Sequence, residues 1–410
     1  MVKAHVATVG FLRVVIAALC VRVVGAWVLG EGATFGPDGT GAEAAVELGG
    51  HPYPVHIAML ELTGGDARAL SMLCSSLSCG LIWLWGRRMG LGSAGGWLAV
   101  TFPLSVFPGV LAAGDAPALA VVLLGATLAT AGGIWVVVGG MVAALSVAIK
   151  PIALAALVLL VARPAALVGA GASLLLLRNF TRPFWAPMPS GGLLGTWWVS
   201  SEGAPPEAWL GWLASGAWRI LDAPGWGSVW VFWLAALAAL TSHRPARLRV
   251  VACLVVGSAV MIGALFGSRL ELRYLATSFV CVLPFLGIWL QSKRAIAIGA
   301  LVGLWPTIAL LTQLNVERGA RDAMARMPSV PLVAWPAVDS GPIFDTCSVD
   351  DATRWRQLAL QLAEVAPIGS TIVADQLPDG REGELLWPLR VLRPDLKFDT
   401  RPPIPDSAPK

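Results

Sequence analysis

Polar residues that could act on a ligand are few in this sequence and lie between long apolar runs. Asp38 lies in the sequence Gly36-Pro37-Asp38-Gly39, where its neighbours favour a turn that presents the carboxylate. Asp115 opens one apolar run, and Lys150-Pro151 closes another. A carboxylate can take a proton from a reacting hydroxyl, and a cation can stabilise negative charge that develops in the reaction. These residue types favour a general base that acts on a substrate with an anionic group.

Two short motifs add further polar residues. The first is His51-Pro52-Tyr53-Pro54, and the second, at residues 269–274, carries two arginines and a glutamate directly before a tyrosine. Arginine can clamp a phosphate through two parallel hydrogen bonds, whereas lysine acts as a point charge. The second motif and Lys150 therefore fit an anionic ligand, and His51 and Asp115 could form hydrogen bonds to the same ligand.

The composition indicates that a membrane positions these residues. Of the 410 residues, 56% are hydrophobic and 13% are charged, and the mean hydropathy is +0.72. A soluble domain has about 25% charged residues. Uncharged runs such as 116–149, 250–268 and 274–292 are long enough for helices that cross about 30 Å of hydrocarbon. We therefore predict an all-α polytopic membrane protein with about eleven transmembrane helices, and exclude a soluble protein.

Hydropathy sets the bounds of the predicted spans. They are residues 6–30, 68–86, 91–113, 115–131, 134–149, 152–162, 165–177, 228–240, 250–266, 274–290 and 295–311. Several are too short to cross alone, so we expect broken or tilted helices around a cavity. Arg22 lies deep within the first span and needs a polar partner there.

The distribution of charge orients the predicted spans. Lys or Arg occupies each connection on one side of the membrane, which makes that side and the N-terminus cytoplasmic. Every acid before residue 313 falls on the other side. The outer side then holds two loops, 31–66 and 179–227, and a small C-terminal region, 313–410. The plasma (inner) membrane is the expected location.

The outer regions also contain predicted secondary structure. In the second outer loop, tryptophans at helical spacing predict an interfacial helix at 206–221. In the C-terminal region we predict a helix at 350–365 and a strand at 371–374.

Each candidate residue also has a purely structural interpretation. Asp38 is a common turn residue, and Asp115 can cap a helix that has Pro117 in its first turn. Lys150 stabilises the negative end of a helix dipole. A ligand site is favoured because both charge signs gather at one membrane face from five separate segments.

The order of these features resembles the GT-C glycosyltransferases, polytopic membrane enzymes that use polyprenyl-phosphate-linked sugars. In that family an essential Asp lies in the first outer loop, as Asp38 does here, and some members follow it with a segment like His51-Pro52-Tyr53-Pro54. A proline-containing third helix, here 101–108, comes next. An acid then starts the fourth helix, where this chain has Asp115.

Two later features extend the resemblance. A basic residue and a proline follow the fifth helix, as Lys150-Pro151 do here, and a late Arg-x-x-x-Arg-Tyr-like signal matches residues 269–274. The resemblance implies a hexosyl- or mannosyltransferase of the cell envelope that uses a lipid, glycan or protein acceptor. It implies Asp38 as the catalytic base. The implied substrate-binding residues are His51, Tyr53, Asp115, Lys150, Arg269, Glu271 and Arg273.

The sequence also predicts which partners the protein has, and it leaves two other functions open. We expect the lipid bilayer as a partner, no nucleic acid and no metal or other cofactor. A divalent cation held by His51 and His56 is a weaker interpretation, because the chain has 4 histidines and no complete ligand set. Two other functions stay open, namely a transporter or flippase of a lipid-linked saccharide and a non-catalytic GT-C-like subunit. Asp38-Gly39 in place of the family's usual Asp-Glu pair keeps the last of these open.

Overall fold

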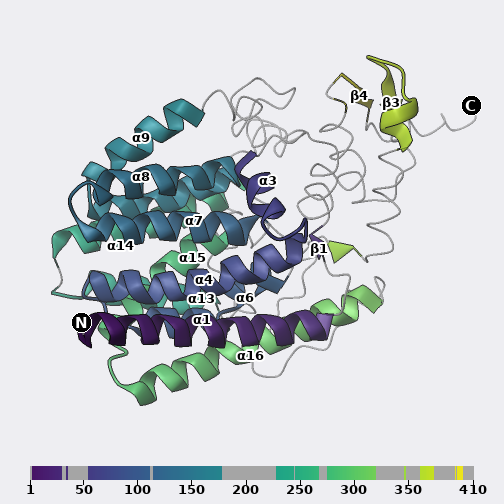
Figure 1. Ribbon diagram of the computed structural model, residues 1–410. Coiled ribbons are helices and arrows are strands. Elements are labelled where there is room, and N and C mark those ends of the chain that lie inside the picture. The colour runs from purple at the N-terminus through teal and green to yellow at the C-terminus, as the bar shows by residue number, and fades with distance from the viewer. Residues whose placement is uncertain are drawn as a thin grey trace, which may run out of the picture.

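The computed structural model describes residues 2–29, 34–35, 54–110, 114–177, 228–243, 245–266, 275–319, 346–347, 361–373, 393 and 395–399. These residues are mostly helical, as predicted, and the helices lie side by side in one body (Figure 1). Two pairs of short strands accompany them.

The α-helices are α1 (Val2–Leu29), α3 (Pro54–Glu61), α4 (Ala67–Arg88), α5 (Ala94–Thr101), α6 (Pro103–Val110), α7 (Asp115–Leu128), α8 (Trp135–Leu145), α9 (Ala165–Leu177), α13 (Ser228–Leu240), α14 (Ala246–Phe266), α15 (Ala276–Val282) and α16 (Lys293–Gly319). The 3₁₀ helices are η1 (Ala129–Ala131), η2 (Ser146–Ala148), η3 (Pro151–Ala162) and η8 (Leu283–Ile288). The strands are β1 (Thr34–Phe35), β2 (Thr346–Cys347), β3 (Thr371–Val373) and β4 (Lys397–Asp399). Each segment predicted as a span contains helix.

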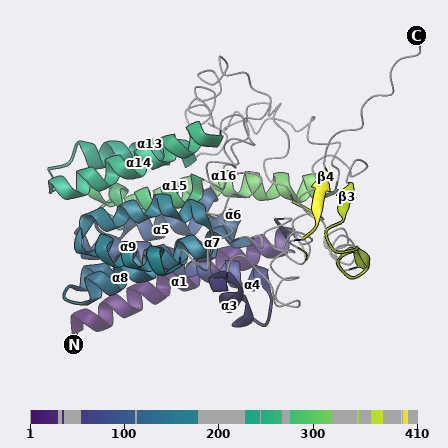
Figure 2. The ribbon, with the colours of Figure 1, turned by 90° about the horizontal axis from the view of Figure 1, so that it is seen from above.

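The helical body is built around α4. This helix packs against α1, α5, α6 and α7, and α8 then joins α7 to α9. Figure 2 shows the same body from above, with β3 and β4 beyond the end opposite to the N-terminus. The predicted boundary at residue 312 falls within α16, because the helix continues to Gly319 after its apolar part ends.

Two helical segments in the described part of the chain are long and apolar enough to cross a membrane. They are Ala7–Val28 in α1 and Ala67–Arg88 in α4, and six shorter apolar helices accompany them. The outer helices also expose large apolar side chains. Examples are Ile16, Val24 and Trp27 on α1, Val168, Leu175 and Leu176 on α9, and Ile298, Leu301 and Val302 on α16. Exposed apolar surface of this extent is typical of contact with a partner or with lipid.

Small residues allow α8 and α9 to approach closely. A Cβ atom added to Gly140 of α8 would overlap the carbonyl of Ala166, and one added to Gly169 of α9 would overlap the carbonyl of Val137. Close backbone contact through glycine is a common way for helices to associate in membranes.

The division of predicted spans into shorter helices is not confined to the short spans. The predicted span 91–113 consists of α5 and α6, and the predicted span 274–290 includes α15 and η8. The shortest predicted span, 152–162, is the 3₁₀ helix η3 of 12 residues. A 3₁₀ helix rises about 2.0 Å per residue, so η3 reaches about 24 Å, against about 18 Å for an α-helix of equal length.

The break between α5 and α6 explains how the guanidinium of Arg22 can be buried without an acidic partner. Pro103 has no N–H to donate to Ala99, and Phe102 adopts an extended conformation. The guanidinium of Arg22 instead donates to the carbonyls of Ala99, at 3.2 Å, and Val100, at 2.6 Å. The partner that Arg22 required is therefore the opened backbone of a neighbouring helix rather than an acid.

The remaining N–H groups of Arg22 are also occupied. They donate to the hydroxyls of Ser75 and Ser105, to the thiol of Cys79 and to the carbonyl of Ala18. Arg22 thus joins α1, α4, α5 and α6 in one buried network.

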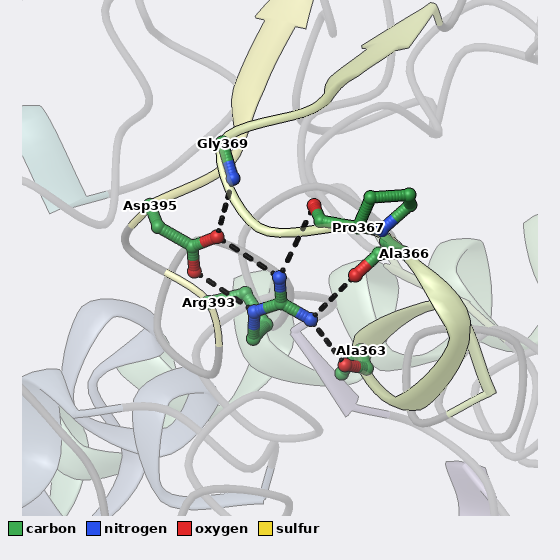
Figure 3. A network of polar contacts seen from close by, with 6 residues as sticks. All are labelled: Ala363, Ala366, Pro367, Gly369, Arg393 and Asp395. Atoms are coloured by element: carbon green, nitrogen blue, oxygen red, sulfur yellow. Dashed lines mark hydrogen bonds and ion pairs between the residues drawn. The ribbon is translucent and has the colours of Figure 1, made fainter.

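The C-terminal region contains a second arginine network (Figure 3). Arg393 donates to the carbonyls of Ala363 and Ala366, which close a short helix at 361–365, and pairs with Asp395 through two hydrogen bonds of 2.8 and 2.9 Å. The Arg393 guanidinium and the Gly369 N–H hold the pKa of Asp395 well below its usual range. The network holds the helix against β3 and β4, which pair in parallel.

The predictions for the outer regions are tested only in part. The predicted helix at 350–365 is described over 361–365, and the predicted strand at 371–374 is β3; both are confirmed there. The predicted helix at 206–221 lies outside the described residues.

Candidate functional site

The centre of the candidate site is a buried ion pair between Asp115 and Lys150. The Lys150 Nζ lies 2.9 Å from Asp115 Oδ2, and the two side chains are 14% and 1% exposed. Asp115 is the first residue of α7. Lys150 lies between η2 and η3 in an extended conformation, with φ −151° and ψ 119°. This conformation follows from Pro151, because a residue before proline is disfavoured in the helical region.

One oxygen of Asp115 has no partner in the part of the chain that the structure describes. Oδ1 is buried, and no hydrogen-bond donor in that part reaches it. A buried carboxylate oxygen without a donor is costly, and each such group in a native structure calls for an explanation. A hydroxyl of a bound ligand would supply the missing donor.

The structure does not support the interpretation of Asp115 as a helix cap. Gly114 is the N-cap residue of α7, and this cap makes no side-chain hydrogen bond. The carboxylate of Asp115 reaches instead across to Lys150. It still gains from the positive end of the α7 dipole, since it lies in the first turn.

His56 of α3 completes the cluster. It is buried, and a Cβ atom added to Gly114 would lie 3.5 Å from His56 Cε1 and 3.8 Å from Lys150 Cδ. The histidine ring and the lysine stem therefore flank the backbone just before Asp115. Three segments that are distant in sequence meet at this point.

Apolar packing positions α3 for this contact. Val55 and Met59 of α3, which lie four residues apart on one helix face, pack against Ala118, Ile149 and Ala153. These partners come from α7, η3 and the turn between η2 and η3, which are the elements that carry Asp115 and Lys150. Packing of α3 thus brings His56 to the ion pair.

Arg68 fixes the neighbouring helix ends. Its Nε donates to the carbonyl of Val110 at 2.9 Å, and its Nη2 donates to the carbonyl of Ala26 at 2.9 Å. It therefore ties the end of α6, four residues before Gly114, to α1 and α4. Asp66 caps α4 beside it, where its carboxylate accepts from the Ala69 N–H at 2.8 Å.

The structure tests the predicted convergence for two residues only. Asp115 and Lys150 meet, although their roles in binding a substrate stay predictions. The other predicted site residues lie outside the described residues: Asp38, His51, Tyr53, Arg269, Glu271 and Arg273. Within the described ranges, no three His, Cys, Asp or Glu side chains gather as metal ligands would.

His56 is the residue that the sequence did not place in the site. Its residue type and spacing indicate only a weak metal pair with His51. A signal did exist, because Val55 and Met59 mark one apolar face of a short helix and His56 lies beside that face.

Comparisons with known proteins give no relative for this chain: no family model, no curated protein and no solved structure matches it.

Proposed function

We propose that the protein is a membrane glycosyltransferase of the GT-C type, which transfers a sugar from a polyprenyl-phosphate donor to an acceptor hydroxyl. The observation that carries the proposal is the Asp115–Lys150 ion pair, in which the buried Asp115 Oδ1 has no hydrogen-bond donor among the described residues. Lys150 offers a cation that attracts the donor phosphate electrostatically while it holds Asp115. The open oxygen of Asp115 accepts from a sugar hydroxyl.

The reaction needs one further group. The acceptor oxygen attacks the anomeric carbon, the bond between that carbon and the phosphate oxygen breaks, and the electron pair leaves on the phosphate. Asp38 takes the proton of the acceptor hydroxyl as a general base. Cations, among them Lys150, Arg269 and Arg273, stabilise the charge that develops on the departing phosphate.

The proposal includes the topology of the chain. About eleven helical segments cross the plasma (inner) membrane, with the N-terminus in the cytoplasm and the C-terminal region outside. The apolar side chains exposed on α1, α9 and α16 support contact with lipid. The site then lies at the outer face, where α3 and the first residue of α7 meet.

Thiol labelling tests this topology. In a background without native cysteines, a membrane-impermeant maleimide applied from outside should label a cysteine placed at Glu202 and a restored Cys347. Cysteines at Arg88 and Arg247 should react only after the membrane is opened, because basic residues mark the cytoplasmic connections. Labelling of the Arg247 site in intact cells would contradict the proposed orientation.

Lys150→Met is expected to weaken binding of polyprenyl phosphate by about 10- to 100-fold, because a charge-assisted hydrogen bond contributes about 1.5–3 kcal/mol. The measurement is equilibrium binding of a short-chain polyprenyl phosphate to the purified protein in nanodiscs. Lys150→Arg keeps the cation and should retain most of the affinity.

Lys293→Met is the matched control. It removes an exposed lysine at the start of α16, the end expected to be cytoplasmic. This variant should bind as the wild type does. Equal affinities of Lys150→Met and Lys293→Met would leave Lys150 as a structural partner of Asp115 alone.

The structure gives less support to a transporter. Transporters use ionisable groups within their spans. Among the described residues, the buried charged side chain outside the site is Arg22. All its N–H groups have protein acceptors, which fits a structural role.

A further inference from the structure

The C-terminal region pairs directly with the first outer loop. β1 and β2 form an antiparallel ladder in which Thr34 is the partner of Cys347 and Phe35 is the partner of Thr346. Figure 1 shows β1 and its partner strand beyond the end of the helical body at which α3 lies. This contact joins segments more than 300 residues apart in the chain.

β1 ends three residues before Asp38, so the contact with β2 involves the chain that leads into this residue. β1 lies in the connection between Leu29, where α1 ends, and Pro54, where α3 begins. Phe35, the last residue of β1, is followed directly by Gly36-Pro37-Asp38.

We propose that the chain after α16 is a positioning segment of the outer-face site, in which β2 holds β1 and thereby the backbone that leads into Asp38. A catalytic base must be held within about 0.5 Å of its productive position. Pairing with a strand from outside the loop supplies a fixed point three residues before the base. The role of Asp38 rests on the proposed function, whereas the pairing of the two segments does not.

The register offers a direct test with a native thiol. Register partners in an antiparallel ladder have Cα atoms about 4.5–5.5 Å apart, within the range of about 4.4–6.8 Å that a disulfide spans. Thr34→Cys should therefore form a disulfide with Cys347 in the full-length protein under mild oxidation. Phe35→Cys is the matched control, because it is one residue out of register with Cys347.

Mass spectrometry of proteolytic peptides reads the result. We expect the linked peptide in Thr34→Cys at a yield at least tenfold above that in Phe35→Cys, and its loss when Cys347 is replaced by Ser. Absence of the link, or equal yields in both variants, would overturn the proposal. These measurements need no transfer assay, so they remain decisive even where the proposed function fails.

A second pair of variants tests the positioning role. Thr346→Pro removes a backbone donor from β2, whereas Thr346→Val keeps a β-branched residue that favours a strand. Limited proteolysis of the intact protein should cut the first outer loop at least tenfold faster in Thr346→Pro and at the wild-type rate in Thr346→Val. Equal rates in the two variants would contradict a holding role for β2.

Sugar transfer by the protein with a disulfide between residues 34 and 347 is the last test. If β2 only positions the loop, Thr34→Cys should transfer sugar equally well when oxidised and when reduced. Loss of transfer on oxidation with recovery on reduction would overturn the proposal, because it would mean that the strands separate in each catalytic cycle.

Discussion

Asp38→Asn is expected to lower the rate of sugar transfer by about 10²–10⁴-fold, which corresponds to roughly 3–5 kcal/mol of barrier. The substitution keeps the shape and hydrogen bonding of the side chain but removes its ability to take a proton. Donor binding should survive, because the asparagine leaves the cations of the site in place. The measurement is transfer of labelled sugar from a polyprenyl phosphate by purified variants in liposomes.

The structure shows which acid is a suitable control for this experiment. Asp115→Asn would break the ion pair with Lys150, so it is not a neutral change. Asp66 is an acid of the same loop region that caps α4, and asparagine caps helices about as well as aspartate. Asp66→Asn should therefore transfer as the wild type does. Wild-type rates in Asp38→Asn would reduce Asp38 to a turn residue, where asparagine is equally suitable.

Arg22→Met is expected to cause the largest loss of stability. Methionine fills the space but leaves the carbonyls of Ala99 and Val100 without their donor. Each buried carbonyl without a donor costs about 1–3 kcal/mol. A loss of roughly 2–6 kcal/mol is a large part of a total stability of about 5–15 kcal/mol. The unfolding temperature of the detergent-solubilised protein should fall by on the order of 10 °C.

Two further variants isolate the cause. Arg13→Met makes the same substitution on α1 at an exposed position, and it should leave the unfolding temperature nearly unchanged. Arg22→Lys keeps a charge and three donors but lacks the planar fork of arginine, so an intermediate loss is expected. An unfolding temperature of Arg22→Met equal to that of Arg13→Met would show that the opened backbone of α5 does not depend on Arg22.

The positions of the helices could be predicted because they follow from local sequence. Apolar runs bounded by charges predict segments that all contain helix, whereas the break in the predicted span 91–113 does not follow from its length. The break at Phe102-Pro103 is visible as a proline. The donor that binds the freed carbonyls cannot be predicted from the sequence, because every residue has a backbone carbonyl whatever its side chain is. The sequence could thus state that Arg22 needs a partner but could not name it.

In the candidate site, too, some features could be predicted from the sequence and others depend on tertiary contacts. Asp115 and Lys150 were predicted to lie at one membrane face, but their contact was not predicted, and the structure places Lys150 Nζ 2.9 Å from Asp115 Oδ2. The contribution of His56 depends on how α3 packs against α7 and η3, which is a tertiary contact. The pairing of β1 with β2 could not be predicted, since strands of two residues carry no periodicity and their partners are far apart in sequence.

The proposed function requires that a polyprenyl phosphate binds beside Asp115 and Lys150. Photocrosslinking of a short-chain polyprenyl phosphate with a diazirine next to its phosphate, followed by peptide mapping of the wild-type protein in nanodiscs, shows where this ligand binds. We expect label in α3, in the first turn of α7 and around Lys150, with displacement by unlabelled polyprenyl phosphate but not by phosphatidic acid. Label spread over the lipid-exposed faces of α1, α9 and α16, with no displacement, would contradict the claim.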